Sequence, residues 1–359
     1  MPAVSVVMPV YNTEEYVAKA IESILNQTFT DFEFLIIDNG ATDGSGKIID
    51  SYAAKDERIR VLRNEKNVFI AEARNQALDQ VSGEYLYLID SDDWVLPDML
   101  EVMYSRAKEI NAQYVVAGYY MDYYVNGKYT SYENCPDDRN YEQAEFRRNA
   151  VDYLTRTLLT VPWNKLYSIS YLREHQIRFR NTKLEDHHFN MDILMDVERV
   201  CMVSKPFYHY YRSRQGTDSE LVYNQFLNQK KREHLAHTLE VYKHWGVDDK
   251  ETMGKLADYH MGRLVQCVTQ TVVNSQLSKV EKKAEIRTIL DDQLTGFAIE
   301  NAKNDSLKIA ILSLPIRMKS QSLCYAMGWF VGEFKEKFSG LYYKMRAQVA
   351  QNAKESAKQ

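Results

Sequence analysis

Compact apolar runs alternate with amphipathic stretches along the first 118 residues of the chain. The runs have the length of buried strands, and the stretches between them repeat apolar residues at helical spacing. The predicted strands cover residues 4–10, 32–37, 59–62, 85–89 and 113–117, and the predicted helices cover 14–27, 44–55 and 69–80, with a further helix beginning at Pro97. Strands that alternate with helices predict an α/β fold with a doubly wound, mostly parallel sheet covered on both faces.

The pattern changes after residue 118. Tyrosines crowd residues 119–141, and the pair Asn126-Gly127 lies between strand-forming residues. Such a pair favours a tight primed turn, so we expect a β-hairpin that adds antiparallel strands to the sheet. The other elements predicted in this region are a helix near 144–158 and strands at 200–203 and 207–211.

Strand signals stop near residue 217. Residues 218–300 contain no proline and have the apolar spacing of several amphipathic helices. A chain of 359 residues is also long for one ordinary domain. We therefore expect an α/β domain over 1–216 and a helical domain over 217–359.

The end of the chain is basic and partly apolar. Residues 303–359 carry ten Lys or Arg and four Asp or Glu. The apolar stretch 309–332 is interrupted by proline and basic residues, so it is too short to span a bilayer. Two interpretations stay open: the stretch lies at the inner membrane surface with Trp329 and Phe330 inserted, or it packs on its own domain with a solvated basic face.

Charge and cysteine content narrow the class of protein. The formal net charge of −5 argues against a nucleic-acid partner, which would call for a basic surface. The four cysteines are too far apart for a metal clip and imply no disulfide framework, so we expect a cytoplasmic protein. The first apolar run has no basic flank and no cleavage signal, and it predicts a buried strand rather than a signal peptide.

An acidic loop follows the strand at 85–89. Asp90, Ser91, Asp92 and Asp93 stand where ligands bind parallel sheets, beyond the carboxyl ends of the strands. Crowded carboxylates repel each other unless a cation lies between them, and hard oxygen ligands suit Mg²⁺ or Mn²⁺. The alternative is an acidic N-cap at Asp93 for the helix that follows.

Polar residues also follow the first two strands. Asp38 ends the second strand and could accept a hydrogen bond from a base or a ribose, or could simply belong to a turn. Tyr11 could stack on a base, and Asn12 could cap a helix. Farther along, Asn67 and Arg74 offer an amide and a guanidinium for base or phosphate contacts.

A second polar group lies about a hundred residues later. Glu185, Asp186, His187 and His188 are consecutive, and a carboxylate here could take a proton from an attacking hydroxyl. The alternative is a helix N-terminus with favourable acids. Adjacent histidines on a helix point in different directions and do not make a metal pair. Further candidate phosphate or acceptor contacts are Trp163, Lys165, Arg212 and Arg214.

The order and spacing of these segments resemble the family 2 glycosyltransferases with the GT-A fold. The matching segments are PVYN at 9–12, Ile37-Asp38-x-Gly40-x-Thr42-Asp43, Ala73-Arg74-Asn75, Asp90-Ser91-Asp92-Asp93, Asn164-Lys165-Leu166-Tyr167 and Glu185-Asp186. They extend over roughly residues 3–215. The chain departs from the family pattern at Asn39, where a second Asp is usual, and at Phe69 or Ile70, where Gly is usual.

The resemblance implies a role for each matched residue. Pro9, Tyr11, Asn12, Asp38 and Arg74 would hold the nucleotide. Asp90 and Asp92 would be the DxD pair that contacts ribose, metal and diphosphate. Asp186 would be the catalytic base.

The resemblance also implies the reaction. An inverting transferase would move a sugar from a nucleoside diphosphate sugar, expected to be a UDP-sugar, to a hydroxyl of a glycan or lipid-linked glycan in surface polysaccharide or teichoic acid synthesis. The QxxRW motif and membrane spans of processive members are not found in the sequence, which favours single addition. Two alternatives remain: a catalytically silent nucleotide-sugar-binding or scaffold protein, and a nucleotidyltransferase on a similar sheet. The acidic segment after the first strand disfavours the latter.

Overall fold

The structure, a computed structural model, describes residues 1–125, 128–212, 227–303 and 306–337. The chain divides into two compact units, Met1–Ser213 and Arg214–Gln359. The predicted turn at Asn126-Gly127 and the candidate residue Arg214 lie outside the described residues, as does the end of the basic tail from residue 338.

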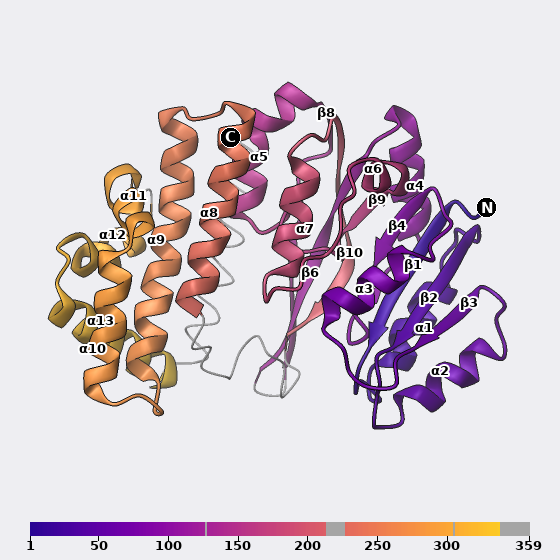
Figure 1. Ribbon diagram of the computed structural model, residues 1–359, viewed down its shortest axis with the longest axis horizontal. Coiled ribbons are helices and arrows are strands. Elements are labelled where there is room, and N and C mark those ends of the chain that lie inside the picture. Colours follow the sequence, from indigo (N-terminus) through magenta and orange to yellow (C-terminus); the bar gives the residue numbers. More distant parts are fainter. Residues whose placement is uncertain (126–127, 213–226, 304–305, 338–359) are drawn as a thin grey trace. The chain divides into compact units, whose positions relative to one another are not determined.

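The first unit contains a single ten-stranded sheet with flanking helices (Figure 1). The strands are β1 Val4–Val10, β2 Phe32–Asp38, β3 Ile59–Arg63, β4 Tyr85–Leu88, β5 Trp94–Val95, β6 Tyr114–Val125, β7 Lys128–Asn134, β8 Arg139–Glu142, β9 Lys165–Ser168 and β10 Arg199–Tyr211. The helices are α1 Val17–Leu25, α2 Ser45–Ala53, α3 Ile70–Leu78, α4 Met99–Ile110, α5 Gln143–Thr155, α6 Ile169–Glu174 and α7 Glu185–Leu194. The predicted α/β fold class is confirmed.

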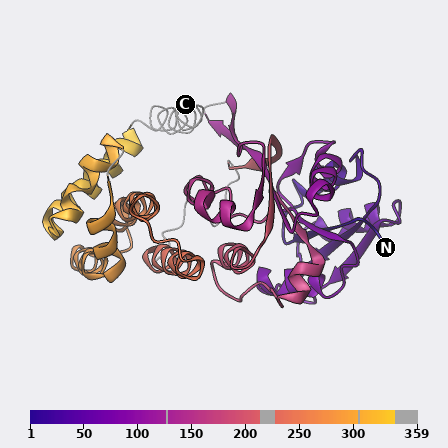
Figure 2. The same ribbon diagram turned by 90° about the horizontal axis from the view of Figure 1, so that it is seen from above.

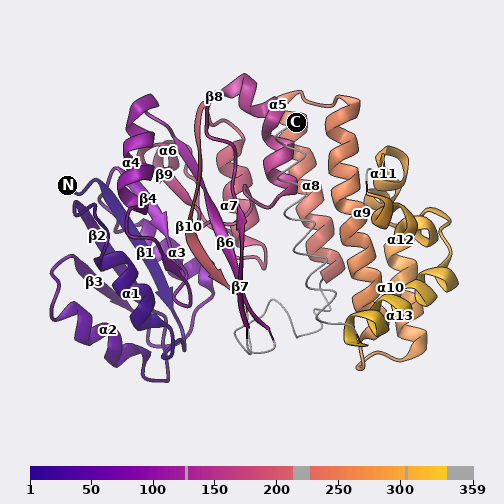
Figure 3. The same ribbon diagram turned by 180° about the vertical axis from the view of Figure 1, so that it is seen from behind.

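The strand order explains why the sheet is mostly parallel. The order is β3-β2-β1-β4-β9-β6-β10-β5, with β7 added to β6 and β8 added to β10. The first four strands are mutually parallel, β9 runs against both β4 and β6, and β10 is parallel to β6. Helices α1 and α2 lie on one face of the sheet and α3 on the other (Figures 1 and 3).

Local sequence accounts for the central elements. All seven residues of β1 are buried, as expected for an apolar strand between two parallel neighbours. The buried residues of α1 (Val17, Ala20, Ile21 and Ile24) form one helical stripe. Helix α1 begins three residues later than predicted, after a turn in which the Tyr16 and Val17 amides donate to the Thr13 carbonyl.

Three strand predictions needed correction. The strand predicted at 113–117 continues as β6 through the first arm of the hairpin. The two strands predicted at 200–203 and 207–211 are one strand, β10, with shifts in register around Pro206. Proline has no amide hydrogen for the ladder, which explains an irregularity there rather than an end. Strand β9 was not predicted, because its four residues are too short for a periodic signal.

The second unit contains helices only, among its described residues. They are α8 Leu227–Trp245, α9 Lys250–Val273, α10 Lys279–Asp291, α11 Gln293–Asn301, α12 Leu307–Arg317 and α13 Gln321–Lys337. Helices α8 and α9 lie side by side and are seen almost end-on in Figure 2. Helix α9 supplies much of the core, which also contains side chains of α10 to α13. A Cβ on Gly328 would stand 2.8 Å from Val272 Cγ2, so α13 approaches α9 closely there.

No helix among the described residues is long and apolar enough to cross a membrane. All four cysteines are free and buried.

Candidate active site

The loop after β1 meets the loop after β2. Asn12 has a positive φ of 50°, and its side-chain oxygen accepts a hydrogen bond of 2.8 Å from the Thr42 amide. Its side-chain nitrogen donates to Thr42 Oγ1 at 3.2 Å. Tyr11 beside it is exposed, whereas Pro9 is buried within β1 opposite Ile37. Tyr11 therefore offers a face to a ligand, and Asn12 fixes the shape of the loop.

The loop after β2 is built on a network of amides. Asn39 is buried, and its side-chain nitrogen donates to Asn67 Oδ1 and to the Val68 carbonyl, both at 2.8 Å. Its oxygen accepts from Asn64 at 2.9 Å and from the Val68 amide at 3.1 Å. Gly40 has a φ of 71°, and a Cβ there would stand 2.5 Å from the Lys66 carbonyl carbon. The amide of Asn39, the residue that departs from the family pattern, thus fixes the segment that contains Asn67.

Asp38 points away from this network. One carboxylate oxygen accepts from the Ala41 amide at 3.1 Å, and the other pairs with Arg63 Nη1 at 2.5 Å. An ionised carboxylate with this partner remains an acceptor for a hydroxyl or a base N–H.

The acidic loop after β4 is anchored on both sides. Ser91 is buried and accepts from Thr13 Oγ1 at 3.0 Å. Asp93 accepts from the Tyr208 hydroxyl at 2.6 Å and from the Tyr211 amide at 2.8 Å, both on β10. The N-cap interpretation of Asp93 is wrong, because the next helix begins only at Met99. Burial and the neighbouring acids hold the pKa of Asp93 well above its ordinary value.

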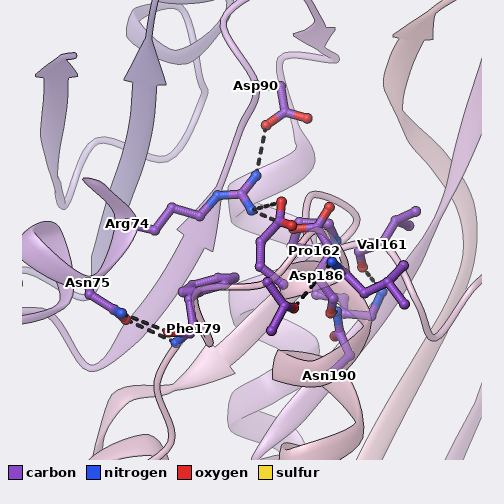
Figure 4. Close-up of polar contacts among 12 residues, drawn as sticks. Arg74, Asn75, Asp90, Val161, Pro162, Phe179, Asp186 and Asn190 are labelled. Carbon is purple, nitrogen blue, oxygen red and sulfur yellow. Dashed lines mark hydrogen bonds and ion pairs between the residues drawn. The ribbon is translucent and has the colours of Figure 1, made fainter. Parts of the chain in front are cut away.

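Arg74 lies at the centre of the site, with only 2% of its surface exposed. Nη2 contacts Asp90 Oδ1 at 3.2 Å, and Nη1 donates to Asp186 Oδ1 and lies 3.6 Å from Glu185 Oε1. Figure 4 shows the guanidinium between Asp90 on one side and Asp186 of α7 on the other. Acids separated by about a hundred residues in the sequence therefore share one cation, and we call this set the carboxylate cluster.

Two amide side chains hold the carboxylate cluster in place. Asn75 donates to the Phe179 carbonyl at 2.8 Å and accepts from the Phe179 amide at 2.9 Å, which ties α3 to the segment before α7 (Figure 4). Asn190 donates to the Asp186 carbonyl at 2.8 Å. The Phe179 ring packs 3.9 Å from that of Phe189 and lies beneath the Arg74 guanidinium.

Two acids of the carboxylate cluster have raised pKa values. Burial raises the pKa of Asp90 to about 6, with further contributions from Asp92 and Asp186 and an opposing one from Arg74. Burial and then the Asp186 carboxylate raise the pKa of Glu185 to about 7, again against Arg74. One guanidinium therefore does not fully compensate the acids around it.

The acidic loop has the donors that a hard divalent cation needs. Asp90 and Asp92 stand two residues apart in this loop, and the Asp92 charge contributes to the raised pKa of Asp90. The described residues contain no group of three or more metal-binding side chains. Mg²⁺ and related ions, however, are commonly held by one or two carboxylates together with substrate phosphates and water. The pair Asp90 and Asp92 fits that pattern.

The other predicted contacts are placed differently. Lys165 is fully buried, and its ammonium donates to the Leu158 and Val161 carbonyls and to Asn164 Oδ1, so its three hydrogens are used inside its own loop. Trp163 is buried and stacks on Tyr208 at 4.2 Å. The predicted residues on α7 are His187, which is buried, and His188, which is half-buried.

Arg212 is half-buried beside Tyr210 at the end of β10. Its amide donates to the Asp122 carbonyl at 2.9 Å.

Sequence reasoning did not identify Phe179, Asn190 or Tyr208 as supports of the site. Asn190 had a signal, since it stands one helical turn after Asp186. Phe179 and Tyr208 act through contacts far apart in the sequence, for which no local pattern exists.

Comparisons with known proteins agree on one family. A family model described as glycosyl transferase family 2 matches residues 5–175. Glycosyltransferase GlyA of Streptococcus pneumoniae is 32% identical over 225 residues, which are 61% of this chain and 32% of GlyA. Glycosyltransferase GlyG of the same organism is 30% identical over 220 residues, which are 60% of this chain and 72% of GlyG. The chain thus spans about a third of one relative and nearly three quarters of the other.

A solved structure has a similar fold. Staphylococcus aureus TarS 1–349 in complex with UDP-GlcNAc superposes with a TM-score of 0.64 at 19% identity, over 93% of this chain and 91% of that chain. At this identity the likeness concerns the fold.

Proposed function

The chain belongs to glycosyl transferase family 2, and on that premise we propose that it transfers a sugar from a nucleoside diphosphate sugar to a hydroxyl of a glycan or lipid-linked glycan. The observation that carries this proposal is the carboxylate cluster, in which Arg74 joins Asp90 of the acidic loop to Asp186 of α7. A donor held at Asp90 and an acceptor beside Asp186 would then be neighbours. We assign this activity to residues 1–216.

The donor would lie along the ends of β1, β2 and β4. Tyr11 would face the base, Asp38 would accept from the base or the ribose, and Asn67 would contribute from the segment that Asn39 fixes. Asp90 and Asp92 would approach the ribose and diphosphate. The UDP-GlcNAc complex of TarS, which has a similar fold, supports a uridine nucleotide as the first donor to test.

Transfer would proceed with inversion. The acceptor oxygen attacks the anomeric carbon from the face opposite the diphosphate and forms the new C–O bond. The bond from that carbon to the diphosphate oxygen breaks, and its electron pair leaves with the nucleoside diphosphate. The hydroxyl proton passes to a carboxylate oxygen of Asp186, whose Oδ1 also accepts a hydrogen bond from Arg74.

Arg74 would act through its neighbours. Its Nη donors are committed to carboxylates and it is buried, so we infer that it positions Asp90 and Asp186 rather than contacting the nucleotide. Mn²⁺ or Mg²⁺ held at Asp92 and Asp90 would neutralise the charge that develops on the diphosphate. His187, His188 and Arg212 remain candidates for acceptor or diphosphate contacts near α7 and the end of β10.

The decisive experiment is a screen of nucleoside diphosphate sugars with Mn²⁺ or Mg²⁺ that measures release of the nucleoside diphosphate. We expect slow release from one sugar nucleotide, lost without metal and in Asp92→Ala. Asp98→Ala is a matched control, because Asp98 pairs with Lys205 outside the cluster. Release that is equal in Asp92→Ala would contradict the role of the acidic loop. Absence of both release and calorimetric nucleotide binding would favour the silent scaffold.

We further propose that residues 217–359 bring the enzyme to the inner membrane surface. On α12 and its C-cap residue Met318, four apolar side chains at helical spacing (Leu307, Ile311, Leu314 and Met318) are each between 53% and 76% exposed, and Trp329 and Phe330 of α13 are also exposed. Lys308, Arg317 and Lys319 accompany them, and residues 306–332 contain no acid. Exposed apolar side chains can insert into the acyl region of a lipid surface, and nearby cations can bind its anionic headgroups.

Vesicle flotation tests the membrane proposal. The protein should float with phosphatidylglycerol vesicles more than with phosphatidylcholine vesicles, and rising salt should weaken the association. The double variant Ile311→Glu/Leu314→Glu should lose it, whereas Val280→Glu, at an even more exposed apolar site on α10, should retain it. Retention by the double variant would instead assign the exposed side chains to contacts with another protein.

A further inference from the structure

A polar cluster between α8 and α9 has no role in the proposed transfer. It consists of Lys231 on α8 and of Tyr259, His260 and Arg263 on α9, and we call it the cation cluster. The two helices lie side by side (Figures 1 and 3). The His234 ring of α8 lies 6.0 Å from the Tyr259 ring of α9. Lys231 stands one turn before His234, and Arg263 stands one turn after Tyr259 on the neighbouring helix, so the two cations lie at the same level of the helix pair. The charges of Lys231 and Arg263 also both act on the pKa of His260.

The donors of the cation cluster are only partly satisfied. Arg263 donates from Nη2 to the Tyr259 hydroxyl, and its guanidinium lies 4.0 Å from the centre of the Tyr259 ring. Nη1 of the same guanidinium is buried and has no hydrogen-bond partner. His260 is 2% exposed, and its Nδ1 has no partner either. One face of the cluster therefore carries polar nitrogens that meet no acceptor within the part of the chain that the structure describes.

No carboxylate compensates the two cations. Across the described ranges, neither Lys231 nor Arg263 forms an ion pair. Asp292 is the acid that acts on His260, but it pairs with Arg232 at 2.5 Å and accepts from the Leu294 amide at 2.8 Å. Charges that are withdrawn from water in proteins are ordinarily paired, because an unpaired charge loses its hydration and gains no ion pair or hydrogen bond that would offset this loss.

The titration of the lysine agrees with this geometry. Burial, and then the Arg263 charge, lower the pKa of Lys231 to about 8. Burial also lowers the pKa of Arg263. An anion placed between the two side chains would reverse both effects.

We propose that the cation cluster binds a phosphate group. A tetrahedral oxyanion can accept hydrogen bonds from Lys231 Nζ and from the unused Nη1 of Arg263, while His260 supplies a further nitrogen at the same place. Guanidinium and ammonium groups are the usual protein ligands of phosphate. The phosphate could be free inorganic phosphate or a phosphodiester within a polymer. This inference stands independently of the proposed sugar transfer.

Equilibrium dialysis of the full chain against ³²P-labelled inorganic phosphate, at constant ionic strength, tests the site. Lys231→Gln and Arg263→Gln should each weaken binding by about 10-fold or more, because each removes a charge-assisted hydrogen bond. Lys279→Gln and Arg287→Gln remove exposed cations from α10 and should leave binding unchanged. Equal binding by all of these proteins would overturn the proposal, as would an absence of phosphate binding by the unmodified chain.

Thermal unfolding gives a second measurement, which remains informative even where a variant no longer binds phosphate. Phosphate should raise the Tm of the unmodified chain by roughly 2–5 °C and leave that of Lys231→Gln nearly unchanged. Without phosphate, Lys231→Gln should unfold at the same or a higher temperature than the unmodified chain, because it removes a half-buried charge that has no ion-pair partner among the described residues. A lower Tm for Lys231→Gln without phosphate would show that this lysine is stabilised inside the fold and would contradict the site.

Competition then distinguishes the two sources of phosphate. A short oligomer of glycerol phosphate that displaces labelled phosphate at lower concentration than inorganic phosphate would support a polymer phosphodiester. Displacement only by inorganic phosphate would support the free ion. Both results require the cation cluster, and both should vanish in Arg263→Gln.

Discussion

The carboxylate cluster of the first unit and the cation cluster of the second unit each contain a buried or half-buried arginine, but they differ in the number of acidic side chains around it. Around Arg74, three carboxylates from two distant segments share one buried cation. Around Arg263, a second cation and a histidine approach a guanidinium with which no acid in the described part of the chain pairs. Arg74 is almost fully buried and Arg263 is half-buried. The acids around Arg74 outnumber its charge, whereas no acid among the described residues pairs with Arg263.

This difference bears on how each site would form. The carboxylate cluster contains its own opposite charge, so its acids can be held in place before any ligand arrives. Its remaining excess of negative charge appears as the raised pKa of Asp90 and Glu185. The cation cluster lacks such a partner, and its stability would depend on an ion from outside the described residues. Substitution of the arginine should therefore cost much more stability in the carboxylate cluster than in the cation cluster.

The largest expected effect is on catalysis, in Asp186→Asn. The amide cannot take the acceptor proton, but it keeps an oxygen for Arg74, so the cluster should stay assembled. We expect the transfer rate to fall by about 10³-fold, within the range for loss of a general base, with donor affinity little changed. Steady-state kinetics with calorimetric donor binding would measure both. An active Asp186→Asn enzyme would move the base to Glu185, and Glu185→Gln would then be the inactive variant.

A stability measurement compares the two arginines directly. Arg74→Gln leaves three acids without their buried cation and should lower the free energy of unfolding by roughly 3 kcal/mol. Arg263→Gln, without phosphate, should cost far less, because no carboxylate loses a partner. Arg178→Gln is the control, since its pair with Asp79 is exposed on both sides and should contribute at most about 1 kcal/mol. Denaturant unfolding that gave equal losses at Arg74 and Arg263 would contradict the comparison.

The excess charge of the carboxylate cluster should also appear in the pH dependence of stability. Glu185 has a folded pKa of about 7, above its ordinary value, so the folded state binds more protons than the unfolded state between about pH 4.5 and 7. Stability should therefore fall as pH rises through this window, and Glu185→Gln should reduce the fall by an amount on the order of 1 kcal/mol. Denaturation midpoints at pH 5, 6, 7 and 8 would measure it. Glu198→Gln is an exposed control that should leave the slope as it is.

Sequence patterns were sufficient to predict the strands and helices that alternate along the first part of the chain. The apolar runs predicted β1, β2 and β4, because a parallel strand buried on both faces is mostly apolar. The strand β3 at the edge of the sheet is only partly buried, and its apolar residues Ile59, Val61 and Leu62 were still sufficient to predict it. The acids at 90, 92 and 186 were identifiable by their order. The convergence of Asp90 and Asp186 on Arg74 was not predictable, since it depends on the Asn75 amide meeting the Phe179 backbone 104 residues away.

The cation cluster illustrates the same limit in the second unit. Lys231 and Arg263 are ordinary polar positions on amphipathic helices, and nothing in the sequence distinguishes them from solvated lysines and arginines. Only the packing of α8 against α9 brings them together and half-buries them. A count of charges along the chain detects charged residues that are adjacent in the sequence. The residues of these two clusters are distant in the sequence and come together only through tertiary contacts.

The amide network around Asn39 is a neutral polar cluster and can be compared with the two charged ones. Asn39 is also a position at which the chain departs from the family pattern. Asn39→Asp keeps the oxygen that accepts from Asn64 and Val68 but removes the donor to Asn67 and to the Val68 carbonyl. A buried carboxylate would then face two acceptors, so we expect a loss of about 1–2 kcal/mol and weaker donor binding through the displaced Asn67. Asn64→Asp, which removes one donor only, should cost less. If Asn39→Asp instead bound the donor more tightly and remained stable, the amide network would be secondary, and the residue usual in the family would be the better ligand for the donor.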